Sequence, residues 1–135
     1  MTLLYRRSRD GGRGKDFYKR CNLKSPTISL FKVKNGPCIG GYTEAKWDNS
    51  KSSKFISDSA AFLFSLTAQL YFPVKNHKNA IYCKGNWGPT FGFDLRSFNE
   101  PNDFDDNYFC RLINSIYRIG VDSTGRNLLS QSDND

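Results

Sequence analysis

The chain has one imidazole, His77, so any serine–histidine or cysteine–histidine relay must pass through it. His77 lies in the polar stretch 75–79, which favours a solvated loop over a catalytic position. The carboxylates of Asp103, Asp105 and Asp106 could form an acid–base pair, but bunched acidic residues in a polar loop more often stay solvated or cap a helix. They also lack the spacing and central glycine of a calcium-binding loop. We therefore expect no enzymatic activity.

Cysteine chemistry is the second possibility, and the sequence gives it little support. The four cysteines are far apart and form no Cys-x-x-Cys pair, which a structural zinc site would normally supply. We interpret Cys21, Cys38, Cys83 and Cys110 as reduced, small apolar residues, and we expect no metal or cofactor. A cysteine-dependent antioxidant enzyme remains an alternative, with Cys21 as its best nucleophile because basic residues surround it in the sequence.

Two further features could bind ligands. Backbone amides of Gly11, Gly12 and Gly14 could hold a phosphate beside Arg13, but their spacing matches neither a P-loop nor a dinucleotide motif, and a flexible turn is the simpler interpretation. The net charge of +7 is uneven: residues 1–93 hold 16 Lys/Arg against 5 Asp/Glu, and the remainder holds 4 against 8. Because the basic residues are mostly scattered, we do not expect nucleic-acid binding.

The chain's length and composition predict one globular domain. It has 135 residues, of which 38% are apolar and 15% aromatic, too many bulky side chains for a disordered protein. The longest apolar run, 60–64, is too short to insert into a membrane, and the N-terminus has no stretch of signal-peptide length. We therefore expect a cytoplasmic protein. Association with the cytoskeleton or with an organelle is compatible with this prediction.

Most of the pattern predicts short strands. Residues 27–34 and 38–43 form an expected hairpin around the turn 35–37, with Ile28 and Leu30 on one face. A shift of the apolar pattern at Phe31 and Val33 could mark a bulge. Other expected strands are 60–67, buried on both faces, 80–83 and 94–98. In the first of these, alternation predicts that Phe62, Phe64 and Leu66 face the core between two sheets, while Ala61, Leu63 and Ser65 lie under a helix or loop.

Two segments have helical spacing. Residues 14–21 place Phe17 and Cys21 on one face of a short helix. Residues 105–119 carry two apolar stripes, at 108, 112 and 116 and at 109, 113 and 117, which predict a second helix. The expected fold class is α+β, mainly β: an antiparallel β-sandwich flanked by one or a few short helices.

Several islands of sequence, taken in order, resemble the TLDc domain family. They span residues 3–95, and each is weak alone, but their order and spacing match. They are Leu3-Leu4-Tyr5-Arg6, Ser8-Arg9-Asp10-Gly11, Phe17, Cys21, Pro26-Thr27, Gly40-Gly41-Tyr42, Trp47, Asp58 to Leu66, Ala80-Ile81-Tyr82, Gly88-Pro89-Thr90-Phe91-Gly92 and Asp94-Leu95. The resemblance also offers an extended alternative to the helix in residues 108–117.

The resemblance implies a β-sandwich without established catalysis, found in intracellular proteins linked to oxidation resistance. Family members bind the vacuolar proton-pumping ATPase, so we expect a protein-interaction module that docks on that pump or on another intracellular complex, for example a cytoskeletal or ciliary one. Residues 1–121 would form the domain, incomplete at both ends, and 122–135 a polar tail. The expected protein-binding residues are Ser8, Arg9, Asp10, Gly11, Gly41, Tyr42, Trp47, Gly88, Pro89, Thr90 and Phe91.

Overall fold

The computed structural model describes residues 1–32, 37–50, 53–97, 108–110 and 117. This part of the chain is mainly β, with antiparallel sheets and short helices, as the sequence predicts. The elements are α1 (Arg7–Asp10), α2 (Gly14–Cys21), β1 (Thr27–Lys32), β2 (Cys38–Thr43), β3 (Lys54–Ile56), β4 (Phe62–Ser65), β5 (Leu70–Pro73), the 3-10 turn η1 (His77–Asn79), β6 (Ile81–Cys83), β7 (Thr90–Phe91), β8 (Leu95–Ser97) and β9 (Tyr108–Cys110). Among these residues, no helix is long and apolar enough to cross a membrane.

The largest sheet has the strand order β1-β2-β4-β5, antiparallel throughout. The pairing of β1 with β2 runs without interruption from Thr27 opposite Thr43 to Lys32 opposite Cys38. No bulge occurs at Phe31, because each residue of β1 has its own partner in β2. Val33, the other position expected to form the bulge, lies outside the described residues.

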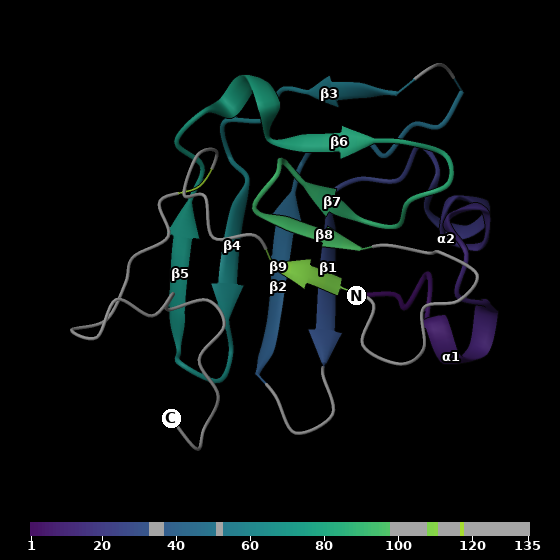
Figure 1. Cartoon of the computed structure of the whole chain (residues 1–135), viewed down its shortest axis with the longest axis horizontal. Helices are drawn as coiled ribbons and strands as arrows, with labels where there is room; N and C mark the ends of the chain where they lie inside the picture. The colour runs from purple at the N-terminus through teal and green to yellow at the C-terminus, as the bar shows by residue number, and fades with distance from the viewer. Residues whose placement is uncertain (33–36, 51–52, 98–107, 111–116, 118–135) are drawn as a thin grey trace.

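Two smaller sheets complete the described fold: β3 pairs with β6, and β8 lies between β7 and β9. The three-stranded sheet runs across the four-stranded one, and α1 and α2 lie at one flank (Figure 1). Phe91 in β7 links these two layers, because its ring lies where a Cβ on Gly41 in β2 would have to be. Glycine at this position allows the layers to approach.

A series of edge-to-face aromatic rings fills the core between the layers. Ring centroids are 5.6 Å apart for Tyr5 and Phe17, 5.5 Å for Phe17 and Trp47, 5.6 Å for Trp47 and Phe91, and 6.4 Å for Phe91 and Tyr117. Trp47, Phe91 and Tyr117 are 0% exposed. The series joins the N-terminal segment, α2, the loop after β2, β7 and the residue that bridges to Val74.

The predicted orientation of β4 is wrong. Ala61, Leu63 and Ser65 are the buried set, at 2%, 0% and 2% exposure, while Phe62 and Phe64 are half-buried on the opposite face and Leu66 is 55% exposed. The rings of Trp47 and Phe91 already occupy the space between the layers, so the sheet presents its smaller side chains there. The alternation of large and small side chains in this run does not determine which face is buried, because both faces are mainly apolar.

The helix expected at 105–119 is wrong where it can be checked, because Tyr108–Cys110 form β9 and pair with β8. Tyr117 likewise forms an antiparallel bridge with Val74. The extended alternative is therefore correct at these positions. The remainder of that segment, most of the turn at 35–37 and the tail at 122–135 lie outside the described residues.

Candidate interaction surface

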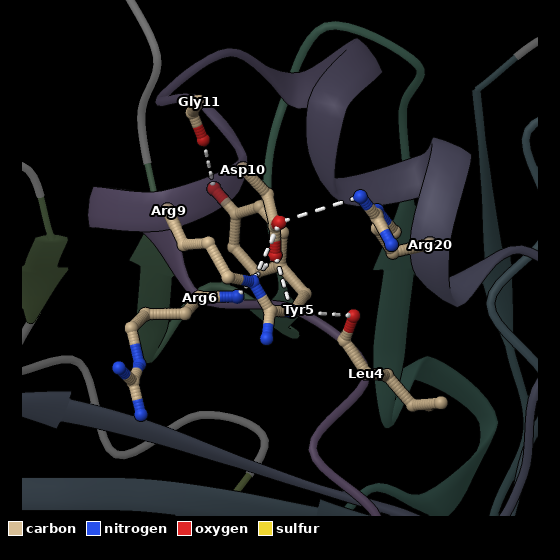
Figure 2. A network of polar contacts seen from close by, with 7 residues as sticks. All are labelled: Leu4, Tyr5, Arg6, Arg9, Asp10, Gly11 and Arg20. Carbon is tan, nitrogen blue, oxygen red and sulfur yellow. Dashed lines mark hydrogen bonds and ion pairs between the residues drawn. The ribbon is translucent and has the colours of Figure 1, made fainter.

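The turn formed by α1 is organised around the carboxylate of Asp10 (Figure 2). Arg9 donates from Nε to Oδ1 and from Nη2 to Oδ2, each at 2.8 Å, and the backbone N–H of Arg6 donates to Oδ2 at 2.8 Å. Arg20 reaches over from α2 and forms an ion pair of 3.5 Å. The Asp10 side chain is only 3% exposed, so it fixes the turn from within and the arginines present the charge to solvent.

The surroundings of this turn shift the pKa values of Asp10 and Tyr5. Hydrogen bonds from Arg9 and from the backbone of Arg6 hold the pKa of Asp10 well below its usual range. Burial raises the pKa of the neighbouring Tyr5 to about 12, and its hydroxyl donates to the carbonyl oxygen of Gly11 at 2.6 Å. Gly11 has a φ of +109°, a conformation that side-chain-bearing residues rarely adopt. The sequence Asp10-Gly11 is therefore needed for the turn itself.

The residues expected to bind a partner divide into two groups. Ser8, Arg9 and Tyr42 have exposed or half-buried side chains, and Asp10 and Gly11 hold the α1 turn. The others are buried: Gly41, Trp47, Gly88, Pro89, Thr90 and Phe91. The second group is part of the packed fold, and binding of a partner through either group stays a prediction.

The sequence prediction missed the outer face of the four-stranded sheet. The β1–β2–β4–β5 register brings Ile28, Tyr42, Phe62 and Pro73 into one row across the sheet, and Leu30, Gly40, Phe64 and Tyr71 into the next. Exposed fractions are 51% for Ile28, 60% for Leu30 and 68% for Tyr71. The rings of Tyr42 and Phe62 stack at 5.0 Å. The alternation in β1 was the available signal for this apolar face.

A second aromatic cluster lies on β3 and β6. The rings of Phe55 and Tyr82 are 4.8 Å apart, those of Phe55 and Phe93 5.2 Å, and those of Tyr82 and Trp87 5.5 Å. Lys84 Nζ lies 4.6 Å from the centre of the Trp87 ring, on which Arg96 also packs at 5.2 Å. These cation–π contacts hold the half-buried Trp87 in place.

A groove of about 850 Å³ separates the N-terminal segment from β1. Every residue from Pro26 to Lys32 lines it on one side, and Met1 to Arg7 line the other. Within the described part of the chain, the charged residues that line it are Arg6, Arg7 and Lys32, all of them basic.

Two of the cysteine thiols, those of Cys21 and Cys83, are poor nucleophiles because of their surroundings. Cys21 and Cys83 are buried, at 6% and 1% exposure. Burial raises the pKa of Cys21 to about 11 and also raises that of Cys83. At neutral pH both are protonated, although Cys21 has basic neighbours in the sequence.

The only imidazole is exposed, as expected, and its Nδ1 lies 3.3 Å from Oγ of Ser57. The adjacent carboxylate of Asp58 is used elsewhere: Oδ2 accepts from Thr43 Oγ1 at 2.6 Å and from the Glu44 N–H at 2.8 Å. Asp58 thus closes the loop after β2 rather than orienting the histidine ring.

The family model of the TLDc domain matches residues 1–126. No curated protein and no solved structure matches the chain. The match covers the three described sheets, both helices and the turn around Asp10. The chain therefore belongs to the TLDc domain family.

Proposed function

We propose that the chain is a non-catalytic protein-interaction module that docks on a large intracellular protein assembly. The vacuolar proton-pumping ATPase is our first candidate, with a link to oxidation resistance. Another intracellular assembly, such as a cytoskeletal or ciliary complex, is the alternative. The observation that carries the proposal is the open apolar face of the four-stranded sheet, where Ile28, Leu30 and Tyr71 are all more than half exposed. Contiguous apolar surface of this kind marks protein contact sites.

The rigidity of this face supports the same function. Four hydrogen-bonded strands hold its side chains in register, and the opposite face of the sheet packs on the core through Ile39, Leu63 and Phe72. A partner would therefore meet a preformed surface and would lose little conformational entropy in ordering it.

A cysteine-dependent antioxidant enzyme that uses Cys21 or Cys83 fits the structure less well. Such an enzyme needs an accessible thiolate, whereas Cys21 and Cys83 are buried and their pKa values are raised. Protection against oxidation, where the chain contributes to it, would then act through the docked assembly.

The test is copurification of the chain with the purified pump by size-exclusion chromatography. Tyr71→Ser removes a ring that is 68% exposed on the open face and should weaken binding by about tenfold or more. His77→Ser removes an exposed ring outside that face and should leave binding unchanged, which also tests any catalytic role of the imidazole.

Failure of the parent chain to bind the pump would exclude the first candidate and favour the alternative assembly. Equal binding by the parent and Tyr71→Ser would show that the pump contacts a surface other than the open face of the sheet. Loss of peroxide protection on replacing Cys21 alone, with pump binding intact, would favour the enzyme.

A further inference from the structure

Strand β1 is an edge of the four-stranded sheet. Its neighbour on one side is β2, and among the described residues no strand pairs with its other side. The groove described above runs along this edge, so that all seven consecutive residues from Pro26 to Lys32 line it. Successive side chains of a strand point to opposite faces of the sheet, so a groove that touches only one face would be lined by alternate residues. Because consecutive residues line this groove, it borders the backbone at the edge of the strand.

The hydrogen-bond pattern shows which backbone groups face the groove. The N–H of Cys38 donates to Thr67 Oγ1 at 2.9 Å, and its C=O accepts from the Leu66 N–H at 2.9 Å, so both groups of Cys38 point away from β1. Cys38 lies opposite Lys32, which makes this a non-hydrogen-bonded pair of the antiparallel ladder.

Because the pattern alternates along the strands, Thr27, Ser29 and Phe31 direct their N–H and C=O groups at β2. The N–H and C=O groups of Ile28 and Leu30 then point outward, to the edge that borders the groove. No hydrogen bond to either residue's backbone occurs on this side within the described part of the chain. An open edge with such groups is a template for another strand.

The chemistry of the groove selects the occupant. Its apolar lining includes Leu3, Ile28 and Leu30, and the charged side chains that line it among residues 1–32, 37–50 and 53–97 are basic, Arg6 among them. The side chain of Arg6 points away from the Asp10 cluster (Figure 2). Side chains of an added strand alternate between two directions, so aliphatic residues of that strand could extend the row of Ile28 and Leu30 while acidic ones meet the basic charge.

We propose that β1 binds an extended peptide segment of the partner, with acidic and aliphatic residues in alternation, as an added strand. This inference rests on the proposed interaction function and specifies how part of the partner is recognised. Main-chain hydrogen bonds to Ile28 and Leu30 would supply affinity, and the basic lining would supply selectivity.

The probe is the blocked peptide Asp-Ile-Asp-Leu-Asp-Ile-Asp, labelled with fluorescein and measured by fluorescence anisotropy against the full chain. The same peptide with Lys in place of Asp should bind about tenfold more weakly or worse. Binding of the acidic peptide should also weaken as salt is raised, because exposed charges are screened.

The decisive variant is Leu30→Pro. Proline removes the outward N–H of residue 30. It leaves every hydrogen bond between β1 and β2 intact, because the backbone groups of Ser29 and Phe31, and not those of residue 30, form these bonds. Leu30→Ala is the matched control, because it shortens the side chain and keeps the N–H. The proline variant should bind the acidic peptide about tenfold more weakly than the alanine variant. An unchanged melting temperature shows that the sheet is intact.

A charge pair of variants tests the same groove without altering the backbone. Arg6→Glu lies in the groove lining and should weaken peptide binding about threefold. Lys15→Glu makes the same change of net charge on the exposed face of α2, outside the lining of the groove. Its peptide affinity should differ from that of the parent by less than threefold.

Absence of peptide binding, a preference for the Lys peptide, or equal binding by Leu30→Pro and Leu30→Ala would each overturn the inference. A concentration-dependent dimer in sedimentation that Leu30→Pro dissociates, without peptide binding, would assign the edge to a second copy of this chain instead. If the parent and Leu30→Pro copurify equally with the pump, the proposed function stands and the edge inference fails.

Discussion

At the scale of single residues, Gly41 determines how closely the two layers pack. A Cβ there would occupy the position of the Phe91 ring, which is fully buried between Trp47 and Tyr117. Gly41→Ala should therefore lower the free energy of unfolding by about 1–3 kcal/mol, measured by urea denaturation. Gly85→Ala is the control, because its new Cβ would meet nothing closer than Asn49 at 4.0 Å. Equal stabilities of the two variants would contradict the observed packing of Phe91.

The carboxylate of Asp10 makes a pH-dependent contribution to stability. Its pKa in the folded protein lies below its ordinary value of 3.8, chiefly because Arg9 and the Arg6 N–H donate to it. A lowered folded pKa means that the stabilisation is complete above the ordinary value and is lost as the pH falls toward the folded one. The stability difference between the parent and Asp10→Asn should therefore shrink as the pH falls from about 6 to about 3. Chemical denaturation at several pH values measures it, and a constant difference would remove Asp10 as the cause.

At the scale of elements, local signals were enough for some segments. The helix Gly14–Cys21 and the strand Cys38–Thr43 were predicted with their observed bounds, because apolar spacing and turn residues define them locally. The capping of that helix is also local, since the carboxylate of Asp16 accepts the Arg13 N–H at 3.0 Å. By contrast, Lys54–Ile56 and Leu70–Pro73 were not predicted as strands. Both are short. Lys54–Ile56 pairs with β6, which is distant in sequence. Leu70–Pro73 pairs with the adjacent β4, but the connection at 66–69 contains no Gly, Pro, Asn or Asp to indicate a turn.

In the candidate site, too, features that depend on sequence neighbours could be predicted, and features that depend on distant elements could not. The α1 turn could be recognised from Asp10 and Gly11, whose roles depend on neighbours in sequence. The burial of Trp47 and the outward orientation of the half-buried Phe62 could not be recognised in this way, because both depend on which elements fill the space between the layers. A contiguous apolar run and a loop tryptophan are each compatible with either side of a sheet.

The orientation of β4 leads to an unusual prediction for two adjacent residues. Leu63 is 0% exposed on the core side, while Phe64 is half-buried on the open face. Leu63→Ala should cost about 2–5 kcal/mol through lost burial and the cavity left behind. Phe64→Ala should cost only about 1 kcal/mol, although it removes the larger side chain. Thermal and urea unfolding of both variants measure this order, and the reverse order would restore the orientation expected from sequence.

At the scale of the whole molecule, the sheet has a covered face and an open one. The covered face packs on the aromatic series from Tyr5 to Tyr117, which links the N-terminal segment to the far end of the described fold. The open face carries exposed apolar side chains beside a basic groove. The core face and the proposed contact surface thus lie on opposite sides of the same strands, so a substitution on one face need not disturb the other.

This separation predicts how the isolated protein behaves in solution. Without a partner, the open face should cause weak self-association that increases with sulfate concentration, because excluded salts favour the burial of apolar surface. Tyr71→Lys places a charge where the ring is 68% exposed, so it should raise solubility while changing the melting temperature little. His77→Lys makes the same charge addition away from the sheet face and should raise solubility less. Light scattering over a sulfate series, with melting curves for each variant, tests this. Equal solubility of the two variants would show that net charge, and not the apolar face, controls association.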